Sequence, residues 1–130
     1  MAAEDNRRTV QLAFERFAEG DLTAVLDLVT DDVVWADRTP AANPISGVYH
    51  GKEGVKEFFG KLLSLSEFSR FEVKQILAEA DTVVVLIDTT ITVRQTGKKA
   101  DLPLVHVLTF RGDKVAAYDL YEDDSVSPWM

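Results

Sequence analysis

Cysteine is absent from this 130-residue sequence, which excludes a disulfide framework, a thiol nucleophile and a thiolate metal site. Histidine is scarce as well. His50 and His106 are the only two, and nothing around them has the spacing of metal ligands, so no metal site is expected. Neither a dinucleotide-binding fingerprint nor the glycine-flanked serine of an α/β-hydrolase is present. The sequence therefore predicts no bound cofactor.

Positive charge is in short supply, because 14 Lys and Arg stand against 22 Asp and Glu, for a formal net charge of −8. Nucleic-acid binding depends on clustered basic side chains, so a nucleic acid is not an expected partner. Long hydrophobic runs are also lacking. No segment approaches the roughly 20 apolar residues that cross a bilayer, and the first residues lack the apolar stretch of a secretion signal. We expect no membrane association and a cytoplasmic location.

Apolar residues are plentiful, at 46% of the chain, whereas charged residues make up 28%. A chain of this length and composition is near the usual size of one folded domain and has enough apolar material to bury a core. We therefore expect a single domain over residues 1–130.

Three segments have helical periodicity. Apolar residues in segments 5–19, 22–29 and 52–65 recur at i, i+3, i+4 and i+7, the spacing that places them on one face of a helix. Gly20 supplies a natural end to the first segment, and Asp21 is a good N-cap for the second. The sequence thus predicts three helices in its first half.

Strand-like segments dominate the rest of the chain. Residues 30–32, Thr-Asp-Asp, are expected to end the second helix, and the β-branched and aromatic residues 33–35 form a short strand. Residues 37–51, rich in Pro and Gly, are expected to form a long loop. Four further strand-like runs have short connections, which indicates antiparallel neighbours. They span residues 71–78, 82–94, 102–110 and 115–122.

The run from Leu102 to Phe110 is largely apolar on both of its faces, since residues of both alternating sets are hydrophobic. One face of such a sheet can cover the helices. The other face needs a different cover, most simply a second copy of the chain. We therefore expect a homodimer.

Four stretches resemble a known family: AEGDL at 18–22, DDVVW at 31–35, YHGKEGVKEFF at 49–59 and KVAAYDLYED at 114–123. With the order of the elements, they resemble the SnoaL-like and ketosteroid-isomerase-like proteins of the nuclear-transport-factor-2-like (NTF2-like) superfamily. The resemblance implies an α+β fold in which a cone-like, curved antiparallel sheet packs on three N-terminal helices, the cystatin-like roll. It says less about activity, because the superfamily includes isomerases, cyclases, hydrolases, dehydratases and non-catalytic binding modules.

Ketosteroid isomerase combines a carboxylate base with an oxyanion hole made by a Tyr and a protonated Asp. The resemblance places Asp37 at the position of the base and His106 at the position of the oxyanion-hole Asp. Ala13 falls where the isomerase has its Tyr, so one role is missing and another is altered.

Each catalytic candidate also has a structural interpretation. In a dry pocket Asp37 would be a proton acceptor, but Asp at the start of a loop commonly hydrogen-bonds its own backbone. His106 could orient a carbonyl or share a proton with Asp37, and it could equally be a satisfied histidine of the core or an interface.

Aromatic side chains could line an apolar cavity, with Tyr hydroxyls as polar anchors, although each could also be plain core. Asp119 lies where SnoaL-like chains are often acidic, and it could equally be a surface carboxylate. The acidic run at 122–124 is interpreted as a solvated exit from the last strand. The ligand-binding candidates are Phe17, Trp35, Tyr49, Phe59, Tyr118 and Asp119.

The leading hypothesis is a SnoaL-like protein that binds a small apolar or carbonyl-bearing molecule. If catalytic, it would be a cofactor-independent isomerase or cyclase that moves a proton next to a carbonyl, with Asp37 and His106 as catalytic residues. The alternative is a non-catalytic ligand-binding or dimeric assembly domain of the same fold. A third hypothesis, an epoxide hydrolase or dehydratase, would draw on Asp119 and Arg94 as further polar groups.

Overall fold

The computed structural model describes residues 2–129, except for the side chain at position 124, and has the expected α+β fold. Its three helices are α1 (Ala2–Ala18), α2 (Thr23–Leu28) and α3 (Gly51–Leu65), and a short 3-10 helix, η1 (Asp124–Val126), follows the last strand. The strands are β1 (Val29–Asp37), β2 (Gly47–His50), β3 (Ser66–Glu79), β4 (Thr82–Val93), β5 (Lys99–Arg111) and β6 (Lys114–Glu122).

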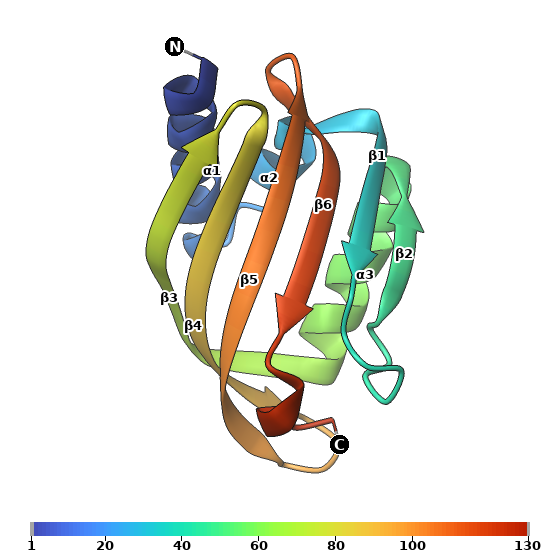
Figure 1. Cartoon of the computed structure of the whole chain (residues 1–130). Helices are drawn as coiled ribbons and strands as arrows, with labels where there is room; N and C mark the ends of the chain where they lie inside the picture. Colours follow the sequence, from blue (N-terminus) through green and yellow to red (C-terminus); the bar gives the residue numbers. More distant parts are fainter. Residues whose placement is uncertain (1, 130) are drawn as a thin grey trace.

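The strands form one sheet in the order β2-β1-β6-β5-β4-β3, and the sheet curls around the helices. Figure 1 shows α1 behind β3 and β4, and α3 behind β1 and β2, so these two helices lie on the concave face of the sheet. The pairing of β3 with β4 shifts register after Phe68 and again after Val73. Such bulges bend a strand and increase its twist, which accounts for the curvature of this edge of the sheet.

The sheet is not wholly antiparallel, which corrects the prediction from the sequence. β1 pairs with β6 in parallel, with Trp35 opposite Tyr118 and Asp37 opposite Leu120. A parallel pair requires a long connection. Here the chain makes α3 and the strands β3 to β5 before β6 returns beside β1, so the two neighbours in space are distant in sequence.

Two local predictions were also wrong. Residues 30–32 belong to β1 rather than to a break, and residues 47–50 form β2 within the expected loop. The β1–β6 register shifts between Val29 and Val34, so the polar residues between them lie at a bulge and need no apolar alternation. β2 is a four-residue edge strand in which only Tyr49 is buried, too short a pattern to identify.

The predicted end of the first helix at Gly20 is confirmed, whereas the predicted N-cap of the second helix is one residue too early. Gly20 follows α1 with a φ of 86°, a left-handed conformation that glycine adopts without strain. The N-cap of α2 is Leu22, which makes no side-chain cap hydrogen bond, although one carboxylate oxygen of Asp21 accepts the backbone N–H of Thr23 at 3.0 Å. Gly20 and Asp21 thus form the turn that leads from α1 into α2.

The core fills the end of the cone where the helices meet the sheet. Val10 of α1 and Val55 of α3 are fully buried there against Val83, Leu108 and Val115 of the sheet. Burying one such side chain contributes about 1.5–3 kcal/mol. Within residues 2–129, no helix is long and apolar enough to cross a membrane.

Candidate functional site

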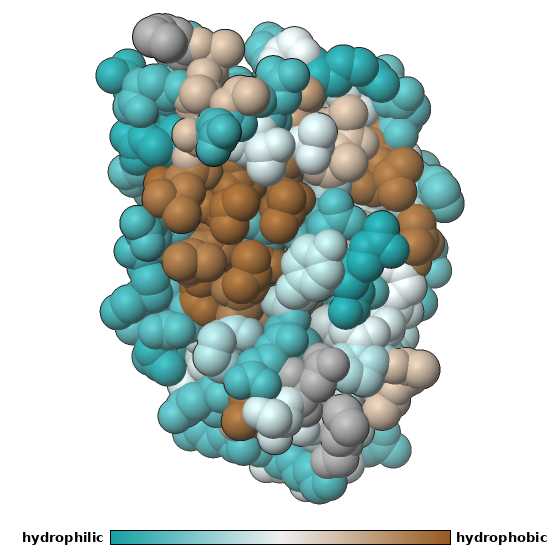
Figure 2. Space-filling view, viewed as in Figure 1, coloured by the Kyte–Doolittle hydropathy of each residue, from teal (hydrophilic) through white to brown (hydrophobic). Residues whose placement is uncertain are grey.

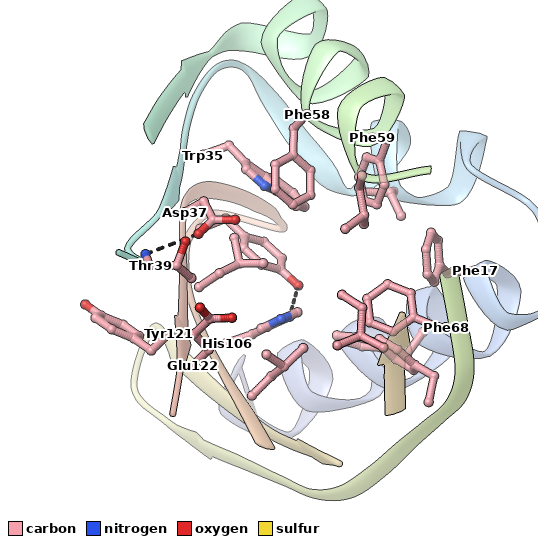
Figure 3. A pocket seen from close by; sticks show the side chains of 18 of the residues that line it. Phe17, Trp35, Asp37, Thr39, Phe58, Phe59, Phe68, His106, Tyr121 and Glu122 are labelled. Atoms are coloured by element: carbon pink, nitrogen blue, oxygen red, sulfur yellow. Dashed lines mark hydrogen bonds between the residues drawn. The ribbon is translucent and has the colours of Figure 1, made fainter. Parts of the chain in front are cut away.

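The concave face of the sheet is not filled throughout, and a cavity of about 90 Å³, measured as the space open to the centre of a water molecule, lies between it and the helices. One water needs about 10–15 Å³ by this measure, so the cavity has room for several waters or one small organic molecule. Its lining is almost entirely apolar. The side chains converge on it from α1, α3 and the inner faces of β1, β5 and β6 (Figure 3).

Aromatic rings form the wall. Trp35 of β1 stacks on Tyr118 of β6 with ring centroids 3.8 Å apart and planes 14° apart. Phe17 of α1 and Phe59 of α3 meet across the top of the cavity, with centroids 5.4 Å apart. Stacked and edge-on aromatic pairs add to the stability that burial provides, so this wall stabilises the fold as well as lining the cavity.

His106 projects from the middle of β5 into the cavity (Figure 3). Its Nδ1 lies 2.6 Å from the hydroxyl oxygen of Tyr118, and both side chains are buried. Burial lowers the pKa of His106 to about 3 and raises the pKa of Tyr118 far above its usual value. Both groups are therefore neutral at physiological pH.

In this wall, Nε2 of His106 and Nε1 of Trp35 are buried and have no hydrogen-bond partner within the described part of the chain. Buried polar atoms are nearly always paired, and leaving one unpaired costs about 1–3 kcal/mol. Because both residues line the cavity, a bound molecule or a water is the natural partner for these nitrogens.

Asp37 lies at the end of β1 and also lines the cavity, with 8% of its surface exposed. One carboxylate oxygen accepts the backbone N–H of Thr39 at 3.2 Å. Burial raises the pKa of Asp37. The hydrogen bonds from Thr39 act in the opposite direction but are the smaller effect. The carboxylate therefore lines the cavity and also hydrogen-bonds its own loop, as the structural interpretation expected.

Asp37 and His106 share the inner face, but they do not touch. Each is paired with Leu120, which lies between them on β6. Neighbouring strands are about 4.8 Å apart, so the two Cα atoms are about 10 Å apart. No hydrogen bond joins the two side chains in the described structure, and a small ligand over Leu120 can contact both.

Six of the eight predicted site residues line the cavity, and Tyr49 and Asp119 do not. The Tyr49 hydroxyl donates to the carbonyl of Ile45 at 2.6 Å beneath the loop, and the Asp119 carboxylate accepts from Arg38 at 3.0 Å on the outer face. The six are Phe17, Trp35, Asp37, Phe59, His106 and Tyr118.

The residues that a hydrolase or dehydratase would need are not brought together. Arg94 bonds the carbonyl of Leu63 and the carboxylate of Glu67, and it is absent from the cavity lining, as is Asp119. Residues 2–129 also hold no cluster of three or more His, Cys, Asp or Glu side chains that could bind a metal ion.

Several lining residues were missed. Glu122, interpreted as a solvated exit, is half-buried and lines the cavity, as does Thr39. Strand alternation could have identified Glu122, because residues 118, 120 and 122 of β6 face the same side. Further missed residues are Phe14, Phe58, Phe68 and Phe71, which were expected as core or not considered.

Comparison with known families finds that a model of the SnoaL-like domain matches residues 10–118. No curated protein matches the chain significantly. Among solved structures, an NTF2-like protein of unknown function from Burkholderia pseudomallei has a TM-score of 0.82 and 26% identity, covering 93% of this chain and 92% of that one.

Two other structures carry functional names. A SnoaL-like polyketide cyclase of Mesorhizobium loti has a TM-score of 0.75 and 19% identity over 93% of this chain and 98% of that one. TerC, co-crystallised with polyporic acid, has a TM-score of 0.78 and 23% identity over 92% of each. At these identities the likeness concerns the fold.

Proposed function

Since the chain belongs to the SnoaL-like family, we propose that it binds a small, carbonyl-bearing molecule in its apolar cavity and moves a proton on the carbon next to that carbonyl. The observation that carries the proposal is the pairing of Asp37 and His106 on either side of Leu120. One is a carboxylate and the other a neutral imidazole, and both line the same cavity.

Asp37 is the base. A carboxylate with a raised pKa holds a proton better than one in water, and the N–H of Thr39 still supports its ionised form. Its hydrogen bonds come from Thr39 at the edge of the cavity, and the carboxylate itself lines the cavity where a substrate would lie. A positioned base of this kind contributes on the order of 10²–10⁴ in rate.

His106 is the partner of the carbonyl oxygen. Removing a proton next to a carbonyl places negative charge on that oxygen, and a hydrogen-bond donor in a dry site stabilises the charge. The imidazole stays neutral and so can donate without first being protonated. The overall reaction is an isomerisation, because the proton taken by Asp37 is returned at a different carbon.

The test uses 3-cyclohexen-1-one, whose isomerisation to the conjugated enone is followed by ultraviolet absorbance. Wild type should accelerate the reaction, and Asp37→Asn should lower kcat by on the order of 10²–10⁴. Asp88→Asn is the matched control, because Asp88 lies on the opposite face of the sheet, paired with the exposed Pro103. Full activity in Asp37→Asn would rule out its role as base.

The alternative is a binding module without catalysis, and the hydrogen bond from Thr39 to Asp37 favours it, because that bond gives the carboxylate a structural task. The two functions differ in one result. A binding module would bind the cyclic ketone in calorimetry without accelerating its isomerisation, and Asp37→Asn would change neither.

We also propose that the protein is a homodimer. Apolar side chains gather on the outer face over β3, β4 and β5 (Figure 2), and a contiguous apolar patch on a soluble protein marks an interaction surface. Leu77 and Tyr121 on this face are 47% and 43% exposed. The half-buried residues between them are Val84, Leu86, Val105 and Val107.

Light scattering at micromolar concentration should give twice the mass of one chain. Leu86→Glu, which places a charge in this outer patch, should give a monomer. Leu63→Glu is the control, because Leu63 is 55% exposed on α3, away from the sheet. A wild-type mass of one chain would rule out the dimer.

A further inference from the structure

The contact between Tyr118 and His106 bears on what the cavity can bind. The Tyr118 hydroxyl is buried, and within the described residues its hydrogen bonding involves Nδ1 of His106 alone. A neutral phenol must donate its proton to an acceptor or leave it unpaired. Nδ1, at 2.6 Å, is the acceptor within reach, so the phenol donates and Nδ1 carries no proton.

The tautomer of His106 follows from this. A neutral imidazole carries one proton, and if Nδ1 accepts, the proton is on Nε2. Nε2 is the ring nitrogen that has no partner in the described chain. The protein therefore leaves a buried N–H donor beside an apolar cavity and supplies nothing for it to bond.

The phenol itself is held firmly. Trp35 stacks on the Tyr118 ring at 3.8 Å, and the Tyr118 and His106 rings lie 5.3 Å apart in an edge-on arrangement. Phe14 of α1 lies beside the imidazole, with ring centroids 6.0 Å apart. Both rings are therefore packed against aromatic neighbours, which hold the two partners of the 2.6 Å hydrogen bond in place beside the cavity.

We propose that Tyr118 is a positioning residue that holds His106 as the Nε2–H tautomer, so that the cavity selects a ligand with a neutral acceptor oxygen. The ligand class is a ketone or a similar uncharged carbonyl compound. A carboxylate is disfavoured, because the imidazole brings no positive charge to pair with it. This inference deepens the proposed function and rests on it only for the step after binding.

The first test is nitrogen NMR of protein labelled with ¹⁵N-histidine, without ligand. The chain has two histidines, and the exposed His50 serves as an internal reference. Wild-type His106 should show a protonated Nε2 and an unprotonated Nδ1. Tyr118→Phe keeps the ring that stacks on Trp35 but removes the hydroxyl, and it should give a mixture of the two tautomers.

Tyr49→Phe is the matched control, since it also removes a buried phenol hydroxyl, but one bonded to Ile45 away from the cavity. It should leave the His106 resonances unchanged. A proton on Nδ1 in wild type would overturn the inference without the need for any variant. An identical His106 pattern in Tyr118→Phe would overturn it as well.

The second test is calorimetric binding of cyclohexanone and of methylenecyclohexane, which has the same shape but no acceptor oxygen. Wild type should bind the ketone roughly three- to tenfold more tightly, the worth of one hydrogen bond of ordinary strength. Tyr118→Phe should lose most of this difference. Equal binding of the two compounds by wild type would overturn the inferred selectivity.

These results separate the inference from the proposed function. An Nε2–H tautomer and a preference for the ketone, with no isomerisation of 3-cyclohexen-1-one, would leave the inference standing and remove the catalytic role. If His106 instead carries its proton on Nδ1 and Asp37→Asn loses much of its activity, Asp37 remains the base and the role given to Tyr118 is removed.

Discussion

Asp37 and His106, which both line the cavity, occupy different parts of their strands, and this difference accounts for their different electrostatics. His106 lies in the middle of β5 and Asp37 at the end of β1, yet they are 6% and 8% exposed. In mid-strand the backbone N–H groups hydrogen-bond to the neighbouring strands, so only side chains are left to hydrogen-bond with His106. At the strand end, the N–H of Thr39 is free to bond the Asp37 carboxylate.

As a consequence, the two side chains differ in how burial affects their pKa values. Burial acts on His106 without opposition and keeps it neutral, whereas the loop partly offsets burial at Asp37. Environments that shift the pKa values of two groups in this way set apart the residue that takes a proton from the residue that only donates a hydrogen bond. The three predictions below test this contrast between strand interior and strand end.

The largest effect should be the loss of stability in acid. His106 has a pKa of about 3 in the folded protein and about 6.5 when unfolded, so between these values the unfolded chain binds a proton that the native state does not. The contribution of neutral His106 to the free energy of unfolding is therefore at its maximum above pH 6.5, and it is lost as the pH falls toward 3. The upper bound is on the order of 5 kcal/mol.

Urea unfolding at several pH values measures this effect. His106→Gln keeps an acceptor for the Tyr118 hydroxyl but does not titrate, so it should flatten the dependence between pH 6.5 and 4. His50→Gln removes the exposed histidine and is the matched control. The same pH dependence in both variants would show that His106 is not the buried neutral group described here.

The next effect compares two tyrosines of β6. Tyr118 is 5% exposed and lies in the stack with Trp35, whereas Tyr121 is 43% exposed. Tyr118→Ala should lower the free energy of unfolding by about 3–5 kcal/mol, as for other large aromatic side chains of a core. Tyr121→Ala should lower it by less than about 1 kcal/mol. Similar unfolding midpoints in urea would contradict the assigned burial.

Most of the fold could be predicted from the sequence, because helical periodicity and strand alternation are local patterns. The three helices and the strands β3 to β6 were expected within a few residues, except that β3 begins at Ser66 rather than Phe71. What local patterns do not contain is pairing between distant segments. The parallel contact of β1 with β6 and the edge strand β2 depend on such pairing, and both were missed.

The site shows the same limit at finer scale. Asp37 and His106 were identified by resemblance, but the bond between His106 and Tyr118 depends on register. The β5–β6 pairing shifts by one residue between Thr109 and Phe110, and only after this bulge does Tyr118 face the same side as His106. Without the shift Tyr118 would oppose Val107 on the outer face. No residue type in the β5–β6 hairpin predicts this bulge from the sequence.

The smallest effect belongs to the strand end. Because burial raises the pKa of Asp37, the folded protein binds its proton more tightly than the unfolded chain does, and stability is lost as the pH rises through the folded pKa. Asp37→Asn removes this loss and keeps an oxygen for the Thr39 N–H. We expect a higher urea midpoint than wild type at pH 8, by less than the two preceding effects, and a smaller gain at pH 4. A variant that is less stable at pH 8 would mean that the carboxylate is held by its loop more strongly than it is opposed by burial, and the strand end would then be a structural device rather than a poised base.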